Sequence, residues 1–319
     1  MVKELDTVSD RILVGYGIRI RPEQVRYKSE FIEESKVSEI VDIMDLDESK
    51  YKNLLDEDII ENVDRKFYSG LLCRESSGKK PNGGLIWEEQ DSETKRETTS
   101  EIVYFDAPDE ETAAELLEEY TSIASGDNVK KTFFELNNIK DDLKSFLKLN
   151  GFTIQERESR FINLTVEEAL KSRFMSSDKY PGRIIPLSAL SLIQFRQWIS
   201  YCFANEECGV YDDLDDVPME WYDQDISCCC VDNSMILGMF LIHRMPSGAL
   251  SPVLLFATGK KARMTVLHML RFAIKTASEK YTGDTIIRVN QYKERTRLLV
   301  SNLFPDSKGK IVMAGIRKE

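Results

Sequence analysis

The chain has 319 residues, of which 42% are hydrophobic and 31% are charged, and its formal net charge is -12. This length predicts two domains of ordinary size, and this composition excludes a disordered or fibrous chain. The net negative charge disfavours a protein that binds nucleic acid or an anionic membrane nonspecifically, because neutralising phosphates requires clustered Lys and Arg.

The charge is unevenly distributed along the chain. Residues 1–160 hold 23 basic and 37 acidic side chains, a balance of -14, whereas residues 226–319 hold 15 basic and 6 acidic ones, a balance of +9. Between them, residues 206–225 contain nine acids and neither Lys nor Arg. Such a stretch next to a binding site attracts a cationic amine, although the simpler interpretation is a solvated loop.

The cysteines indicate a reducing compartment. There are six, three of them consecutive at Cys228, Cys229 and Cys230, and this arrangement suits neither a disulfide framework nor a metal site. On a strand these three side chains alternate between the two faces as small buried residues. The N-terminus MVKELDTVSD lacks the apolar core of a signal peptide, so we expect a cytosolic protein without a membrane span.

The first half predicts alternating strands and helices. Residues 11–20 are a weak candidate strand, and residues 29–64 resemble an acidic helical region. We then expect strands at 66–74, 85–89 and 101–106, a helix from Pro108 capped by Asp106 or Asp109, a strand at 132–136, a helix at 141–149 and a long strand at 152–164.

The second half repeats this order. We expect strands at 183–187, 226–231, 235–243 and 250–257, with a helix at 192–204 after the first of them. A long helix at 263–280, a strand at 285–289, a helix at 294–303 and a strand at 311–316 follow. Because linker residues gather at 165–182, this duplication predicts two tandem domains, 1–165 and 166–319.

Three segments of the second half carry a resemblance to a known family. They are SMILGMFLIHR at 234–244, LSPVLLFATGKKARMTVLHMLRFA at 250–273 and TIIRVNQYKERTRLLVSNLFP at 285–305. They resemble, in order, the fourth strand, the fifth strand with its phosphate-binding turn and helix, and the sixth strand with its helix, of the GNAT superfamily of acyl-CoA-dependent N-acyltransferases. The first half is more faintly similar, through GGLIWEEQ, EIVYFDAPDEETAAELLEEY and KSFLKLNGFTIQE. The resemblance implies an α/β (α+β) fold class: two GNAT-like domains, each a mixed, mostly antiparallel sheet flanked by helices.

The resemblance also implies where acyl-CoA binds. In GNAT enzymes the coenzyme A pyrophosphate rests on backbone N–H groups where the fifth strand meets the next helix, and a helix N-terminus favours such an anion. In the second half this turn comprises Phe256, Ala257, Gly259, Lys260, Lys261, Ala262, Arg263 and Met264. Its three cations attract phosphate, and Gly259 permits an unusual backbone angle.

The matching turn of the first half, Asp106–Glu111, holds four acids and a proline, which repel phosphate and remove one donor. We therefore expect acetyl-CoA or another acyl-CoA to bind in the second half alone. The second turn keeps only one glycine of the family's pattern, and the alternative is a solvated basic loop.

Three side chains are candidates for the general base that deprotonates the substrate ammonium. They are His243 at the end of its strand, Asp225 just before the strand at 226, and Glu88 on the first-half strand that corresponds to that of His243. The structural alternatives are a packed histidine and a solvated Asp225. The tyrosine that many GNAT enzymes use as general acid aligns with Val300, which cannot donate a proton.

Two functions follow from these residues. One is an N-acyltransferase that moves the acyl group of acetyl-CoA or another acyl-CoA directly to a small-molecule or peptide amine within a ternary complex. A cationic amine suits the acidic stretch with Trp221 and Tyr222. The alternative is a catalytically inactive GNAT-like protein that senses a ligand or binds a partner. Neither nucleic acid nor a membrane is expected as a partner, and the sequence sets no oligomeric state.

Overall fold

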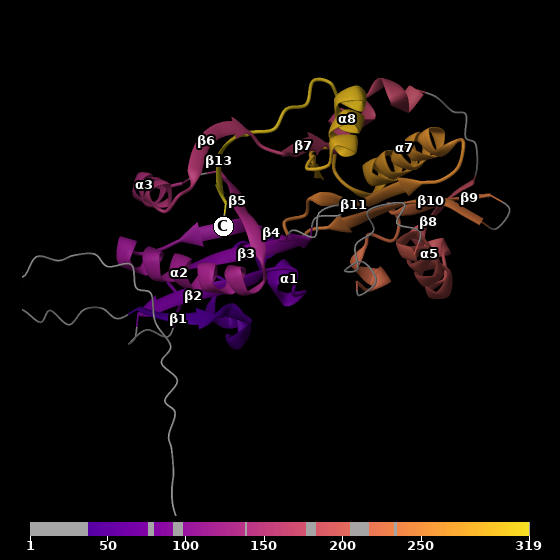
Figure 1. Ribbon diagram of the computed structural model, residues 1–319. Helices are drawn as coiled ribbons and strands as arrows, with labels where there is room; N and C mark the ends of the chain where they lie inside the picture. Colours follow the sequence, from indigo (N-terminus) through magenta and orange to yellow (C-terminus); the bar gives the residue numbers. More distant parts are fainter. Residues whose placement is uncertain are drawn as a thin grey trace, which may run out of the picture. The chain divides into compact units, whose positions relative to one another are not determined.

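The computed structural model describes residues 38–75, 80–91, 98–137, 139–176, 183–204, 217–232 and 235–318 (Figure 1). These residues belong to one compact unit, Ser38–Glu319. The candidate strand at 11–20 and residues 206–216 of the acidic stretch lie outside the described residues.

The first half follows the expected order with two corrections, one at β1 and one, given below, at the strand expected across 152–164. Its elements are β1 (Ser38–Asp42), η2 (Ile43–Asp45), η3 (Glu48–Lys50), α1 (Glu57–Asp64), β2 (Ser69–Glu75), β3 (Gly83–Asp91), β4 (Thr98–Asp106), α2 (Glu110–Gly126), β5 (Val129–Leu136), α3 (Asp141–Leu149) and β6 (Thr153–Glu158). The helix expected across 29–64 is wrong at β1, because Ile40 pairs with Cys73 of β2 and this tertiary pairing overrides the local helical pattern. Asp109 caps α2, as expected.

The elements of the second half include every one that the sequence predicts, and also four short helices that it does not predict. They are β7 (Phe161–Thr165), α4 (Val166–Leu170), η4 (Arg173–Ser176), β8 (Arg183–Pro186), η5 (Leu187–Ala189), α5 (Leu192–Ala204), η6 (Met219–Trp221), β9 (Cys228–Asp232), β10 (Met235–Arg244), β11 (Leu250–Ala257), α7 (Ala262–Lys280), β12 (Ile286–Asn290), α8 (Glu294–Leu303) and β13 (Ile311–Lys318). The repeated order is therefore confirmed along the described chain.

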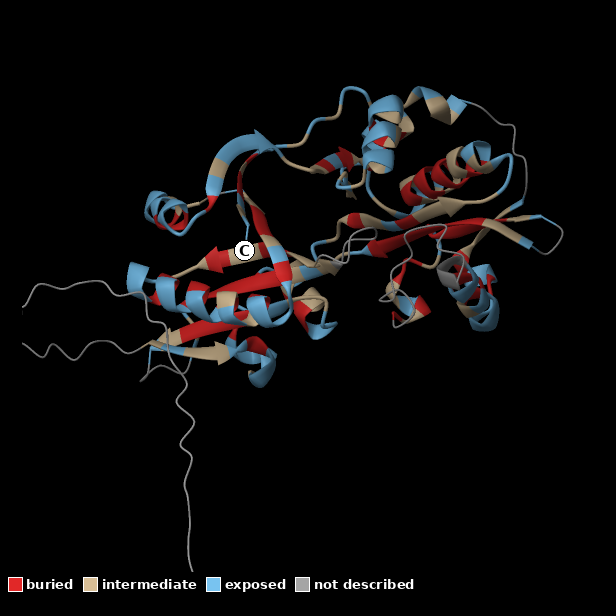
Figure 2. Cartoon of the chain, in the orientation of Figure 1, coloured by how far each residue is buried: buried red, intermediate tan, exposed pale blue. Residues whose placement is uncertain are grey.

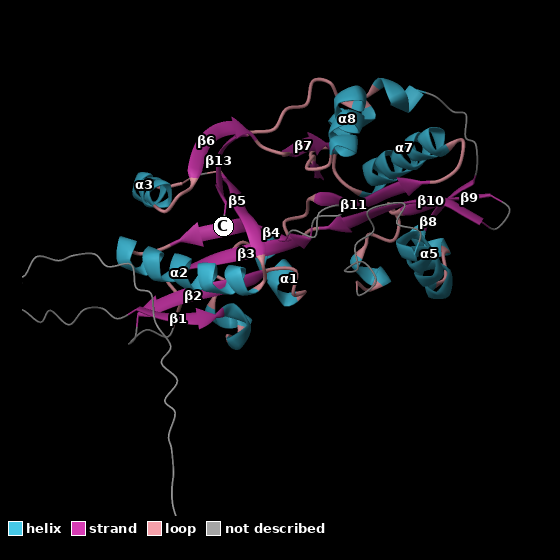
Figure 3. Ribbon diagram, in the orientation of Figure 1, coloured by secondary structure: helices cyan, strands magenta, loops and turns pink. Residues whose placement is uncertain are grey.

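The strands form two mixed sheets, drawn in magenta in Figure 3. The first sheet has the order β1-β2-β3-β4-β5-β13-β6, and the second has the order β7-β12-β11-β10-β9-β8. Each sheet contains one parallel pair, β4 with β5 and β11 with β12, and the remaining pairs are antiparallel. The predicted fold class, mixed and mostly antiparallel sheets flanked by helices, is confirmed.

The two halves exchange a strand. The long strand expected at 152–164 is two strands, since β6 lies in the first sheet and β7 in the second, where Leu164 pairs with Ile287. In return β13, expected to close the second half, lies between β5 and β6 of the first sheet. The chain crosses at Arg160, whose carbonyl accepts a hydrogen bond from Gln291 N–H. Each sheet is thus completed by a strand from the other half of the sequence.

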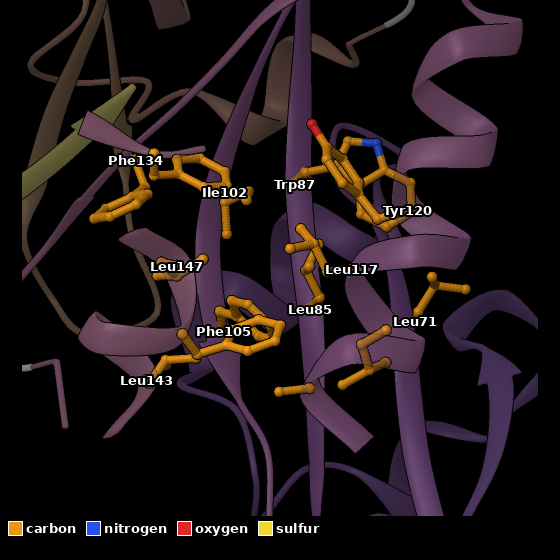
Figure 4. Close-up of a cluster of buried hydrophobic side chains, with 14 of the residues drawn as sticks. Leu71, Leu85, Trp87, Ile102, Phe105, Leu117, Tyr120, Phe134, Leu143 and Leu147 are labelled. Atoms are coloured by element: carbon orange, nitrogen blue, oxygen red, sulfur yellow. The ribbon is translucent and has the colours of Figure 1, made fainter. Parts of the chain in front are cut away.

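Helices cover the first sheet with apolar side chains. Figure 4 shows Trp87 of β3 against Tyr120 of α2, with ring centroids 5.1 Å apart in an edge-on contact. Tyr120 also shares a hydrogen bond of 2.8 Å with Thr132 of β5, so its polar end is satisfied inside the core. This packing holds α2 against the first sheet.

In the second half the three consecutive cysteines alternate between two cores, as expected. Cys228 and Cys230 lie in the cluster that includes α7, and Cys229 lies in the cluster that includes α5. Figure 2 shows buried residues along one side of α7. Burial raises the pKa of Cys229 to about 12, so the thiol stays protonated and packs as an apolar group. Among the described residues, no helix is long and apolar enough to cross a membrane.

A substitution at Gly315 of β13 tests how tightly this exchanged strand packs in the first sheet. A Cβ built there lies 2.2 Å from the ring of Phe134, so Gly315→Val forces the ring or the strand to move. We expect a loss of about 2 kcal/mol in the free energy of unfolding, measured by urea denaturation. Gly126→Ala is the matched control, because its Cβ meets nothing within 4 Å. Equal stability of the two variants would contradict the tight seating of β13.

Candidate active site

The turn between β11 and α7 presents backbone donors and cations together. Gly259 has a φ of +80°, the left-handed conformation that glycine adopts without strain, and it leads into α7 at Ala262. Within the described ranges, the N–H groups of Lys260, Lys261 and Arg263 have no hydrogen-bond acceptor. Three donors and three exposed cations thus meet at the start of a long helix, an arrangement suited to an anion.

The remaining residues predicted for cofactor binding flank this turn. Phe256 and Ala257 end β11, and the Phe256 ring packs against Trp198, with centroids 5.6 Å apart. Ala262 N–H donates to the Gly259 carbonyl at 3.1 Å and closes the turn, and Met264 is exposed on the first turn of α7. These eight residues adjoin one another in the sequence, and among them Arg263 alone lines the cavity described below.

In the corresponding turn of the first half, a side-chain carboxylate accepts a hydrogen bond from a backbone N–H group. Asp109 caps α2 and accepts a hydrogen bond of 2.8 Å from Thr112 N–H. Asp106 pairs with Lys140 at 2.6 Å. Because a carboxylate already occupies this helix N-terminus, a phosphate faces both competition and repulsion there.

The two parallel strands of the second sheet separate beside the basic turn. Among the described residues, β11 and β12 pair at Leu250–Ile287 alone, so the rest of β11 has no strand on that side. A bulge at Val253, between the pairs Leu241–Leu254 and Ile242–Pro252, bends β11 away. In the first sheet, β4 and β5 pair as far as Ile102–Phe134, and the bulge falls at the next residue of β4. In both halves, therefore, the two parallel strands separate next to a bulge.

A cavity of about 2790 Å³, lined by residues of both halves, includes this opening. Its lining includes Arg263 at the basic turn, Leu254 of β11, Ile287 of β12 and Leu299 of α8. Residues of the first half, among them Glu88, also line it. The cavity thus connects the separated strands with the carboxylates of the first half.

The structure places His243 in a bridge. Its Nδ1 lies 2.8 Å from the Trp221 carbonyl oxygen and its Nε2 lies 2.8 Å from Glu61 Oε2, while the Trp221 indole stacks on the ring. Two protein oxygens therefore face the two ring nitrogens. Both ring nitrogens of His243 are thus engaged with the protein itself.

Asp225 lies in an ion-pair cluster, 2.7 Å from Lys280 Nζ. Lys280 also bonds both oxygens of the buried Asp223, at 3.0 and 3.2 Å, and the Tyr281 hydroxyl donates to Asp223 as well. Burial by itself raises the pKa of Asp223, but these donors outweigh it and hold the pKa below 3.8. The cluster fixes the loop before β9 against the end of α7.

Glu88 lies on β3 and lines the cavity. The side-chain amide of Gln90 donates to its carboxylate at 2.9 Å. Of the three base candidates, Glu88 and His243 line the cavity, and Asp225 does not. Glu88 is therefore the predicted carboxylate that the structure brings to the cavity.

The sequence did not single out a second carboxylate nearby, Glu101 of β4. It is buried and paired with Arg160, whose guanidinium lies 5.3 Å from the Phe133 ring centroid, 5.1 Å from that of Phe161 and 5.7 Å from that of Tyr292. Burial raises the pKa of Glu101, and Arg160 only partly opposes this effect. The only sequence signal was an acid at an inward position of an apolar strand.

Glu61 on α1 is likewise not predicted as a site residue, because no local pattern links it to His243. The two residues are 182 positions apart in the sequence. A contact of that separation depends on the tertiary fold and leaves no trace in local periodicity.

Comparisons with known proteins test the fold. A scan against models of protein families and a search of curated protein sequences gave no match. A solved tandem GNAT protein from the clavulanic acid biosynthesis pathway matches with a TM-score of 0.54 at 8% identity, covering 88% of this chain and 98% of that one. The chain has a tandem GNAT fold.

Two further solved structures are similar to this chain. One is a GCN5-related glucosamine N-acetyltransferase region of a fungal multi-domain β-N-acetylglucosaminidase, with a TM-score of 0.57 at 9% identity. The match covers 88% of this chain and 38% of that one. The other is a probable N-acyltransferase of unknown function from Enterococcus faecalis V583, with a TM-score of 0.50 at 10% identity, covering 88% of this chain and 73% of that one. At these identities the similarity shows the GNAT fold alone.

The ion-pair cluster predicts a pH-dependent contribution to stability. Asp223→Asn leaves Lys280 without its buried partner, and we expect a loss of about 2 kcal/mol at neutral pH in urea denaturation. Because the folded pKa of Asp223 is lowered, its contribution is complete above about pH 4 and is lost as the pH falls through the folded value, so the two proteins converge in acid. Asp225→Asn is the control, with an effect below about 0.5 kcal/mol at this half-exposed position. A difference that persists unchanged at low pH would contradict this account.

Proposed function

We propose that this protein is an acyl-CoA-dependent N-acyltransferase whose acyl-CoA site lies in the second half. The observation that carries the proposal is the separation of β11 from β12 beside the basic turn at Gly259–Arg263. An unpaired strand edge and a set of free N–H donors occur together at the place where the GNAT fold suits an acyl-CoA.

Each part of the ligand has a chemical match in the chain. The pantetheine arm carries two amides, which pair with the open edge of β11 in the manner of an added strand. The pyrophosphate suits the free N–H groups of Lys260, Lys261 and Arg263, supported by their positive charges. The acidic turn at Asp109 argues against a second acyl-CoA in the first half.

The reaction is the transfer of an acyl group from sulfur to nitrogen. The neutral amine attacks the thioester carbonyl, the C–N bond forms, the C–S bond breaks, and coenzyme A leaves as a thiol. The ammonium loses one proton before attack and the amine loses a second as the thiolate is protonated. Backbone N–H groups next to the Val253 bulge stabilise the oxyanion. We assign the removal of the first proton to Glu88, with an amine of positive charge as the acceptor.

A catalytically inactive GNAT-like binding protein is the second candidate. It is favoured by the engagement of His243 and Asp225 in hydrogen bonds and by the apolar Val300 at the position of the family's tyrosine. Both candidates share the acyl-CoA site and differ in turnover. Release of free thiol in the presence of an amine acceptor supports the enzyme.

We place the protein in the cytosol. The described cysteines, Cys73 and Cys228–Cys230, are buried free thiols, which suits a reducing compartment.

A double charge reversal tests whether the basic turn binds the pyrophosphate. Lys260→Glu with Lys261→Glu replaces attraction to the pyrophosphate by repulsion, so the affinity for coenzyme A and acetyl-CoA should fall at least about tenfold in isothermal titration calorimetry. The control is Lys275→Glu with Lys308→Glu, which makes the same charge change at exposed positions away from the turn.

Two results would contradict the proposal. Unchanged affinity in the double variant would remove the pyrophosphate from this turn. Failure of the wild-type protein to bind either ligand at several hundred micromolar would exclude an acyl-CoA site altogether.

A further inference from the structure

A row of polar side chains crosses the second sheet where its two parallel strands separate. His243 of β10 pairs with Ser251 of β11. Arg288 of β12 pairs with Asn163 of β7. Ser251 and Arg288 each lie one residue beyond the last pair of the parallel strands. The four side chains therefore follow one another across β10, β11, β12 and β7, and we call them the polar row.

The polar row shares one face of the sheet. Its neighbours along the four strands are packed into apolar clusters with residues of α7 or α8: Ile242, Leu250, Ile287 and Leu164. Because successive side chains of a strand point to opposite faces, the polar row points away from these two helices. All four members of the row line the cavity. Arg288 is half-buried and Asn163 is exposed, so packing leaves part of their surface accessible.

Arg288 is a charged member of the row that has no partner of opposite charge among the described residues. Its guanidinium lies 4.4 Å from the Phe161 ring centroid and makes neither an ion pair nor a side-chain hydrogen bond with them. Arg160, whose guanidinium lies 5.1 Å from the same centroid, is instead paired with Glu101. A guanidinium presents N–H donors in a planar fork that matches a carboxylate. Arg288 therefore keeps these donors for a ligand.

The first half supplies a second donor, the Tyr68 hydroxyl, which also lines the cavity. Burial raises the pKa of Tyr68, and the carboxylates of Glu88 and Glu101 raise it further. The guanidinium groups of Arg288 and Arg160 oppose this effect, so both act on the hydroxyl. The hydroxyl stays protonated at neutral pH and has no hydrogen-bond partner in the part of the chain that the structure describes. Arg288 and Tyr68 thus offer donors to one small anion.

The charges around Tyr68 favour a carboxylate as this anion. A phosphate monoester carries nearly two negative charges at neutral pH, and the carboxylates of Glu88 and Glu101 repel it strongly. A carboxylate carries a single charge, which one guanidinium matches in a bidentate pair.

The polar row also lies beside the place assigned to the chemistry. Ser251, next to Arg288, is two residues before Val253, a distance of about 7 Å along β11. In the proposed reaction, the bulge at Val253 stabilises the oxyanion and Glu88 deprotonates the ammonium. An acceptor whose carboxylate binds Arg288 can therefore place its amine between the bulge and Glu88.

We propose that Arg288 binds a carboxylate of the acyl acceptor and that this acceptor is an amino acid. The inference rests on the proposed N-acyltransferase function and names the substrate class of the same site. The ammonium faces Glu88, and the carboxylate faces Arg288 with help from the Tyr68 hydroxyl. Arg288 thus determines specificity, because an amine without a carboxylate cannot form the ion pair.

The test compares amino acids with amines of the same carbon skeleton. The full chain, saturated with coenzyme A, is screened by thermal shift against the standard amino acids, β-alanine and γ-aminobutyrate at millimolar concentration. Calorimetry then compares each amino acid that binds with its decarboxylated amine, for example serine with ethanolamine. Without the charge-assisted pair, the amine should bind at least about tenfold more weakly. Equal affinities for an amino acid and its amine would overturn the inference.

Variants of Arg288 provide an independent readout. Arg288→Gln removes the charge, so the affinity for the amino acid should fall at least about tenfold while that for coenzyme A stays unchanged. Arg288→Lys keeps the charge without the planar fork and should lose less, and it serves if Arg288→Gln folds poorly. Arg297→Gln is the matched control, because Arg297 is exposed on α8 and does not line the cavity. An equal loss in Arg288→Gln and Arg297→Gln would contradict the role of Arg288.

The outcomes separate this inference from the proposed function. If coenzyme A binds and no amino acid does, the acyl-CoA site stands and the assignment of Arg288 is wrong. If coenzyme A fails to bind, the acyl-CoA site is wrong, and the same screen without coenzyme A still tests Arg288.

Discussion

Backbone pairing between β11 and β12 stops after one pair, and the second half is organised around that interruption. A strand edge without a partner leaves polar N–H and C=O groups that must be satisfied by water or a ligand. The bulge at Val253 turns β11 outward, and α7 begins where β11 ends, so the open edge leads directly to a helix N-terminus. The basic turn thus lies at one end of this opening.

The same architecture carries opposite electrostatics in its two copies. In the first half a carboxylate from the chain itself caps the helix after the parallel strand, at Asp109. In the second half the corresponding N-terminus has no capping side chain and is surrounded by Lys and Arg. A capped helix is more stable, whereas an uncapped one keeps its donors for a ligand. This difference between two short turns is the reason for assigning the proposed acyl-CoA site to the second half.

Local signals predicted most of the elements, because hydrophobic periodicity and turn residues act over short distances. The hairpin β9–β10, the long helix α7 and the cap at Asp109 were all recognisable from neighbouring residues. β1 was missed, since Ser38–Asp42 becomes a strand only by pairing with β2. The residues of the candidate site likewise include some that the sequence predicts and some that only the tertiary fold brings together. The turn at Gly259–Arg263 is continuous in sequence, whereas the partners of His243 and Glu101 come from Glu61 and Arg160, whose positions depend on how the two halves pack.

The exchange of β7 and β13 places a condition on how the chain folds during synthesis. β5 ends at Leu136, but its neighbour on one side is Met313–Lys318, almost at the end of the chain. The first sheet therefore stays incomplete, with β5 and β6 unjoined, until β13 has left the ribosome. Loop closure over such a separation is slow, and exposed strand edges in the interval favour aggregation. The first sheet is thus completed by β13, which is synthesised after every described strand of the second sheet.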